Sequence, residues 1–297
     1  FSSSSFELVN CRINWVSRHP YESNVKLFGF TNINRVAFRS MTISNIDRIR
    51  GIDISNAAEL ILENFSISSS SQNYVTENLC FIDLKSIEAV NITGLTVSSV
   101  NLKNNFFCSS FKDALEYVKV TYKGIMPIKN LDIKDITFGS ENRIPFKLFD
   151  LSTVGRTLNY QFENISLSNI VTGQTLFMEV YSFLKLQYSY DALNVTITKL
   201  NIINCFAPIM KFTNGSLYIY NSTLANVKNY TIVNSLGQVG IFDLQSVTNV
   251  LIDRLNATNF ESFANLIGVF SLKNEGTLTF NQINLYNCIN YFSSGLI

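Results

Sequence analysis

The sequence has little charge and almost no histidine. Charged residues make up 15% of the 297 residues and the net charge at pH 7 is +1, whereas an average soluble domain has roughly 25% charged residues. A surface of this kind does not attract nucleic acid, so no nucleic-acid partner is expected. The chain has a single histidine, His19. One histidine cannot form an H-E-x-x-H zinc site or a three-histidine metal centre, and it leaves little room for a Ser-His-Asp triad.

Cysteines and long apolar runs are also scarce. Five cysteines without a C-x-x-C pair are too few for a disulfide scaffold and give no zinc ribbon or thioredoxin-like motif. No apolar stretch approaches the ~18 residues of a transmembrane helix, so no membrane span is expected. Neutral groups fill the polar positions, with 36 asparagines against 22 Asp and Glu. Hydrophobic residues still make up 46% of the chain, which is enough for a large core.

An internal repeat with a spacing of about 30 residues organises the chain. Its unit is an eight-residue pattern, apolar-x-apolar-x-turn-apolar-x-apolar, with copies starting at Phe6, Val36, Leu60, Val90, Leu131, Tyr160, Val195, Leu217, Val250 and Leu278. All of its inward positions are hydrophobic except Ser222. The apolar phase changes at the fifth position, which indicates a tight bend. Fifth positions that favour a left-handed backbone predict a turn ladder of Asn10, Asn64, Gly94, Asp135, Asn164 and Asn221.

A further short apolar strand precedes several copies, as at residues 52–54, 82–84 and 242–244. Each unit therefore holds three strands and cannot bury its inner face alone, whereas stacked units enclose a continuous core between three parallel sheets. We expect an all-β fold, a right-handed parallel β-helix of about ten coils, with residues 1–297 as a single domain.

The coil between Val90 and Leu131 is the longest, and it predicts one interruption of the strands. Apolar residues at helical spacing and a capping box at Ser110 and Asp113 indicate a short helix near residues 110–118. An ordinary strand through residues 115–122 is the alternative.

The three strands per coil, the asparagine-rich turn between the second and third strands, and the variable loops elsewhere resemble the right-handed β-helix of the pectin-lyase-like superfamily. The resemblance covers essentially the whole chain. That fold carries lyases, hydrolases, tailspikes, adhesins and surface repeats, so the resemblance implies an architecture rather than an activity.

The resemblance implies that a polysaccharide lyase or hydrolase would act on the outward face of the first-strand sheet. Asp53, Asp83, Asp150 and Asp243 are outward there. Asp53 and Asp83 fall in consecutive coils and form a weak candidate site for Ca²⁺ or a shared proton; the alternative is exposed aspartates between inward apolar residues. Lys85, the nearest base, is expected beyond the strand, and the N-T-D, D-D and G-H-G segments of a polygalacturonase-like site do not occur. We therefore assign no catalytic residue and expect no cofactor.

Eight N-x-S/T sequons for N-linked glycans occur, at Asn64, Asn91, Asn164, Asn194, Asn214, Asn221, Asn229 and Asn256. The composition predicts about six by chance, so the number alone does not indicate secretion. Asn91 and Asn256 are predicted outward on strands, and Asn214 and Asn229 in loops, where a glycan fits. The three sequons at the turn position are expected to be modified less.

The cysteine spacing predicts one disulfide. Cys80 and Cys108 are about one coil apart and would lie above one another, with two packed thiols as the alternative. Cys205 and Cys288 are three coils apart, roughly 14 Å, which exceeds the ~7 Å Cα limit for a disulfide. Cys11 takes an inward position and is expected in the core.

The ends of the repeat suggest continuation. No capping helix is recognisable, and residues 295–297 resemble a first strand, so we expect tandem copies or head-to-tail stacking; the alternative is that the caps lie elsewhere. The leading hypothesis is a non-enzymatic extracellular or cell-surface structural protein, a glycosylated fibre or coat segment whose partners are its own copies and N-linked glycans. A polysaccharide lyase or hydrolase and a carbohydrate-binding adhesin are the alternatives.

Overall fold

A computed structural model describes residues 4–17, 25–47, 50–71, 81–102, 107–111, 124–138, 146–154, 158–171, 175–183, 193–205, 208–213, 215–229, 242–245, 247–262, 267–269 and 272–291. These residues form strands and turns without a helix. Every strand pairing among them is parallel. The predicted all-β parallel solenoid is therefore confirmed.

The strands are β1 (Ser5–Val9), β2 (Arg12–Ser17), β3 (Lys26–Arg39), β4 (Thr42–Asp47), β5 (Arg50–Ser71), β6 (Ile82–Leu102), β7 (Phe107–Phe111), β8 (Gly124–Phe138), β9 (Phe146–Val154), β10 (Leu158–Val171), β11 (Thr175–Phe183), β12 (Leu193–Ile203), β13 (Pro208–Thr213), β14 (Ser216–Asn229), β15 (Phe242–Gln245), β16 (Val247–Ser262), β17 (Ile267–Val269), β18 (Leu272–Tyr286) and β19 (Ile289–Asn290).

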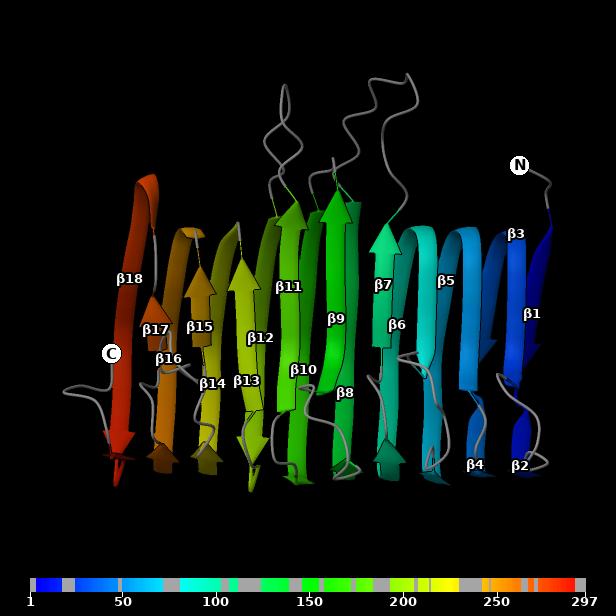
Figure 1. Cartoon of the computed structure of the whole chain (residues 1–297), viewed down its shortest axis with the longest axis horizontal. Helices are drawn as coiled ribbons and strands as arrows, with labels where there is room; N and C mark the ends of the chain where they lie inside the picture. The colour runs from blue at the N-terminus through cyan, green and yellow to red at the C-terminus, as the bar shows by residue number, and fades with distance from the viewer. Residues whose placement is uncertain are drawn as a thin grey trace.

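The strands wind into one elongated coil (Figure 1). The first strands of the coils, including β7, β9, β11, β15 and β17, run upward on the near side, and the chain returns downward behind them while it advances from one end of the molecule to the other. This winding is right-handed, as the crossover preference of parallel sheets predicts. The longest strands bend at the corners of the coil and so cross from one sheet to the next.

Two corners are built along the whole coil from residues with a left-handed backbone, and a third has this conformation at Asn32 and Asn56, each with φ 56°. The first corner column holds one residue per coil, with φ between 49° and 71°: Asn10, Ser40, Asn64, Gly94, Asn130, Asn164, Lys199, Asn221, Arg254 and Gln282. The second corner column lies five residues later, with φ between 49° and 61°: Trp15, Asn45, Ser69, Ser99, Asp135, Asn169, Asn204, Asn226, Asn259 and Asn287. Asparagine dominates because it tolerates this conformation better than other residues with a side chain.

The register corrects one copy of the repeat. Met126 pairs with Tyr160, and Asn130 lies opposite Asn164, so the fifth copy begins at Met126 and not at Leu131. Asp135 therefore belongs to the second corner column, not to the predicted turn ladder with Asn164. The pattern was ambiguous here because both corners are flanked by inward apolar residues, so a shift of five residues preserves the apolar match.

The predicted helix near residues 110–118 is wrong at its start. Ser110, the proposed cap, lies in β7, which pairs with β6 and β9. Residues 112–118, and the alternative strand at 115–122, lie outside the described residues. Helical spacing of a few apolar residues is a weak signal when some of the same residues also fit a strand.

A single apolar cluster fills the interior of the coil. It consists mainly of Ile, Leu, Val and Phe side chains with less than 4% exposure, and each such burial contributes about 1.5–3 kcal/mol relative to exposure. Ser222, the polar exception of the repeat, is also buried, and its hydroxyl donates to the Tyr220 carbonyl oxygen at 3.3 Å. The core continues into the first and last described coils, where the inward residues become partly exposed.

Candidate functional site

Strand pairing in the first-strand sheet brings several acidic residues into one line. Strand register places nine residues in one line, here named the first-strand column: Gly29, Asp53, Asp83, Cys108, Asp150, Glu179, Lys211, Asp243 and Gly268. The sequence predicted the four aspartates but not Glu179 or Lys211. The alternating pattern could have found both, because each stands directly between two apolar residues of a first strand.

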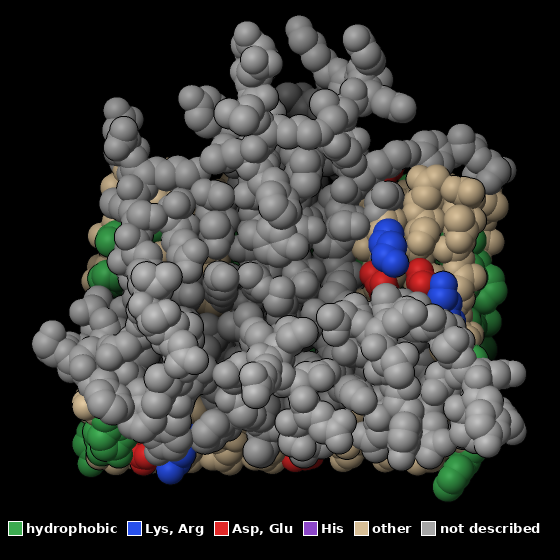
Figure 2. All heavy atoms as spheres, viewed as in Figure 1, with side chains coloured by type: hydrophobic (Ala, Val, Ile, Leu, Met, Phe, Trp, Pro, Cys, Tyr) green, Lys and Arg blue, Asp and Glu red, His purple; other side chains and the backbone are tan. Residues whose placement is uncertain are grey.

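Asp53 and Asp83 are direct neighbours in this column and are both buried, with 5% and 7% exposure. Lys26 Nζ lies 2.6 Å from Asp53 Oδ2, and Lys85 Nζ lies 3.3 Å from Asp83 Oδ2. Acidic and basic side chains lie side by side on this face, over the strands nearest the N-terminus (Figure 2). Each carboxylate thus has its own ammonium group.

These ion pairs change the interpretation of the predicted aspartate pair. The interpretation of Asp53 and Asp83 as exposed spacers is wrong, because both are buried. The expectation that Lys85 falls beyond the strand is also wrong, since Lys85 lies within β6 and contacts Asp83. Within the described part of the chain, no group of three or more His, Cys, Asp or Glu side chains is arranged to hold a metal ion. The arrangement brings acids and bases together, as proton-transfer chemistry requires.

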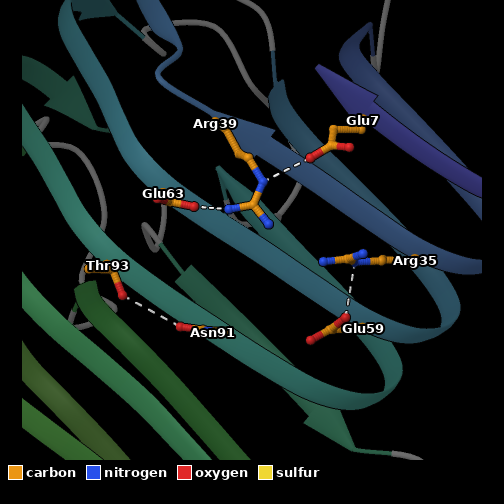
Figure 3. A network of polar contacts seen from close by, with 7 residues as sticks. All are labelled: Glu7, Arg35, Arg39, Glu59, Glu63, Asn91 and Thr93. Atoms are coloured by element: carbon orange, nitrogen blue, oxygen red, sulfur yellow. Dashed lines mark hydrogen bonds and ion pairs between the residues drawn. The ribbon is translucent and has the colours of Figure 1, made fainter. Parts of the chain in front are cut away.

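The outward face of the second strands carries a network of exposed charges (Figure 3). Arg39 bridges three coils: its Nε lies 2.8 Å from Glu7 Oε1, and its Nη1 contacts Glu63. Further along the same face, the Lys129 ammonium lies 2.8 Å from Glu163 and lowers the pKa of that carboxyl, by hydrogen bond first and charge second. Exposed pairs of this kind contribute little to the stability of a fold, because solvent screens the two charges.

The second corner column forms a continuous amide ladder that the sequence did not predict. Each side-chain Nδ2 donates to Oδ1 of the preceding coil, at 2.8–3.4 Å, along the run Asp135, Asn169, Asn204, Asn226, Asn259 and Asn287. In the first corner column, where the ladder was expected, the described bond is that from Asn164 Nδ2 to Asn130 Oδ1, at 2.9 Å. The sequence does carry a signal for this ladder: asparagines recur five residues after those of the first corner, as at Asn169 after Asn164 and Asn226 after Asn221.

The sequons differ in how their side-chain amides are used. Asn91 and Asn256 are exposed on β6 and β16, and their Oδ1 atoms accept hydrogen bonds. Asn164 and Asn194 instead donate Nδ2 to an asparagine of the preceding coil, each at 2.9 Å.

The other four sequons fall into two groups. Asn64 and Asn221 are exposed at the first corner. Asn229 ends β14 and does not lie in a loop as predicted, while Asn214 is outside the described residues.

Three cysteines in the described part of the chain are single thiols. Cys11, Cys205 and Cys288 are free. Cys80 lies outside the described residues, and the register neighbour of Cys108 is Asp83, three residues beyond Cys80. The predicted Cys80–Cys108 disulfide stays a prediction.

Comparisons were made with family models, curated proteins and solved structures, and none of the three gave a match. Among the described residues, no helix has the length and apolarity needed to cross a membrane.

Proposed function

We propose that the protein is an extracellular structural rod, a segment of a fibre or surface coat that lengthens by head-to-tail stacking of its coils. The observation that carries the proposal is the polarity of the second corner column. Every ladder asparagine points its Nδ2 toward the preceding coil and its Oδ1 toward the following one, so successive coils join in one direction only.

The first and last described coils present matching faces. Asn287 donates Nδ2 to Asn259, so its Oδ1 faces a further coil. At the other end, Asn14 Oδ1 accepts from Ser44 and Asn45, which directs its Nδ2 outward. Continuing the register by one coil would place Asn287 beside Trp15 and Asn14, where donors meet the Asn287 acceptor.

Apolar contacts follow the same register. The first copy of the repeat begins at Phe6 and the last at Leu278, so stacking aligns their inward residues one by one. Trp15 and Tyr286 are 79% and 73% exposed, and both lie at the second corner. Aromatic side chains at the rim of a stacking face are typical anchors of protein–protein contacts. The low net charge of +1 adds little repulsion between copies.

Sedimentation velocity over a range of concentrations, with electron microscopy of the same samples, tests the proposal. We expect species of increasing length, in steps of one copy, or about 48 Å for ten coils at the usual strand spacing. Leu278→Lys should abolish stacking because it places an ammonium group against Phe6 of the next copy. Phe6→Glu in the same chain should restore it by pairing the two charges. A folded monomer at every concentration would overturn the proposal.

We propose as a second candidate a polysaccharide lyase or hydrolase of the pectin-lyase-like superfamily that uses the first-strand column. It is favoured by Asp83 and Lys85, which place a carboxylate and an ammonium 3.3 Å apart on that face. Incubation with acidic polysaccharides and Ca²⁺ should then produce unsaturated or reducing ends, and Asp83→Asn should lose this activity while Asp253→Asn on another face retains it. No turnover excludes this candidate, and saturable glycan binding without turnover supports an adhesin.

A further inference from the structure

The amide groups of the eight sequons are not equivalent, and the coil decides which of them can be modified. An N-linked glycan is attached at Nδ2 of asparagine, whereas Oδ1 stays a carbonyl oxygen that can accept a hydrogen bond. A sequon whose Oδ1 is used by the fold therefore stays compatible with a glycan. A sequon whose Nδ2 lies in a bond between coils does not.

Asn91 and Asn256 belong to the compatible group. Thr93 Oγ1 donates to Asn91 Oδ1 at 3.5 Å (Figure 3), and Asn284 Nδ2 donates to Asn256 Oδ1 at 2.8 Å. Both asparagines are exposed and outward on a strand, and none of the described hydrogen bonds between coils uses their Nδ2. The Asn284 bond would persist, because it uses only the carbonyl oxygen of Asn256.

Asn164 and Asn194 belong to the incompatible group. Asn164 Nδ2 donates to Asn130 Oδ1 and Asn194 Nδ2 donates to Asn159 Oδ1, both at 2.9 Å. A sugar on either nitrogen would lie against the preceding coil, about one strand spacing of 4.8 Å away. Asn194 is in addition only half-exposed.

We propose that Asn91 and Asn256 carry N-linked oligosaccharides and that docking between coils excludes them from Asn164 and Asn194. This inference rests on the extracellular placement of the proposed function. The co-reactant is an oligosaccharide on a lipid pyrophosphate carrier. A bond forms between its anomeric carbon and Nδ2, the bond from that carbon to the pyrophosphate oxygen breaks, and Nδ2 loses one proton and keeps the other.

Transfer at the incompatible sites competes with folding of the coil. A solenoid can fold by adding each coil to the previous one, and synthesis releases the N-terminal coils first. Asn159 is thus in place before Asn194 arrives, and coil docking withdraws Asn194 Nδ2 from the transferase. Docking does not engage Nδ2 of Asn91 or Asn256 in a described bond between coils, so it leaves both nitrogens available to the transferase.

The test is site occupancy, measured by peptide mass spectrometry on the 297-residue chain secreted from eukaryotic cells. We expect Asn91 and Asn256 to be occupied in most molecules, and Asn164 and Asn194 in a small minority. Equal occupancy at all four sites, or empty Asn91 and Asn256, would overturn the inference.

A remote substitution separates the role of the fold from that of the local sequence. Asn159→Ala removes the acceptor of Asn194 Nδ2 but lies 35 residues away and leaves the sequon intact. It should raise the occupancy of Asn194 several-fold, and Asn130→Gly should do the same at Asn164 while keeping the left-handed corner. As a matched control, Asn284→Ala removes a donor to Asn256 Oδ1 and should leave occupancy at Asn256 unchanged. If Asn159→Ala and Asn130→Gly change nothing, docking does not control the modification.

The outcome is separable from that of the proposed function. Stacking is measured on protein produced in bacteria without glycans, so empty sequons in the secreted protein would leave the sedimentation result intact. A monomer with the expected pattern of occupancy would overturn stacking and retain the glycan assignment.

Discussion

At some corner and core positions of this fold, only glycine fits. Gly94 occupies the first corner column with φ +71°, and a Cβ atom there would lie 2.7 Å from Asn64 Oδ1. Gly51 has no such backbone requirement, yet a Cβ atom would enter the ring of Phe81, at 2.7 Å from Cδ1. The two glycines are therefore needed for different reasons, one for conformation and contact and the other for space in the core alone.

Gly51→Ala should destabilise the protein by about 1–3 kcal/mol, the usual effect of overpacking a core. The Phe81 side chain is fully buried, and the Phe81 carbonyl oxygen accepts a hydrogen bond from Ile52 N–H at 2.9 Å. The ring therefore cannot easily move away from an added Cβ atom. Gly29→Ala is the control, because its Cβ atom would make only an ordinary 3.6 Å contact with Lys26. Chemical denaturation compares them, and equal free energies of unfolding would contradict this account.

The Cys205 thiol should make stability depend on pH in the alkaline range. Burial raises its pKa to about 11 from 9.0, and its side chain is 2% exposed. Because the folded pKa is the higher one, the stabilisation is complete below pH 9.0 and is lost as the pH rises through about 11. The loss should reach about 2–3 kcal/mol.

Denaturant unfolding of the protein and of Cys205→Ala at several pH values measures this effect as a difference. Subtracting the free energies of unfolding of the two proteins removes the contribution of other titrating groups. A difference that stays constant with pH would disprove the role of the Cys205 thiol. Cys288 follows Asn287 of the second corner column, as Cys205 follows Asn204, but it is only half-buried. Cys288 should therefore react with a thiol reagent faster than Cys205.

At the scale of the element, the second corner column joins consecutive coils by side chains as well as by backbone. Its asparagines combine two properties that no other residue supplies together: tolerance of positive φ, and an amide that donates to one neighbour and accepts from the other. The flanking strands need only alternate apolar and polar residues. The corners therefore carry the sequence information that fixes the register between coils.

Replacing Asn226 separates these two properties. Asn226 has φ 52°, donates to Asn204 Oδ1 at 3.0 Å and accepts from Asn259 Nδ2 at 2.9 Å. Asn226→Gly removes only the hydrogen bonds and should cost about 1 kcal/mol, whereas Asn226→Ala also strains the backbone and should cost about 2–3 kcal/mol. Thermal or denaturant unfolding gives both values. Asn201→Ala, on an outward strand position, should change stability little, and equal effects of Gly and Ala at 226 would contradict the left-handed corner.

At the scale of the whole molecule, the rod is held by its core and its ladders, and charges contribute little. The described ion pairs are mostly exposed, as the Arg39 and Arg35 pairs are. Apolar burial is continuous from the first described coil to the last. Such a molecule can extend by repetition, since each coil depends only on its neighbours.

Stability should therefore be nearly independent of salt. Between ~0.1 M and ~1 M NaCl, the free energy of unfolding should change by less than about 1 kcal/mol, because exposed ion pairs are weak and screened. Denaturant titrations at several salt concentrations test this. A decrease of several kcal/mol would show that the charge network of the second-strand face holds the coil together.

The fold was predictable because its repeat consists of alternating apolar residues that face inward. Examples are Leu60, Leu62, Phe65 and Ile67, all of which are buried. Periodicity does not distinguish one corner from the other, so Asp135 was placed in the wrong column and the ladder from Asp135 to Asn287 was missed. The ion pair between Lys26 and Asp53 was missed as well, since its partners lie in different coils.

The sequence by itself determined the parallel solenoid, its period and its inward residues, because burial of alternate side chains is a local property of each strand. Only the tertiary structure decided which residues stand in line across coils: that Asp53 and Asp83 are buried beside lysines, and that Asn164 and Asn194 donate their amides while Asn91 and Asn256 accept. The physical reason is register. Loops of unequal length separate the coils, so contacts between coils depend on how the strands align, and alignment is set by the whole stack.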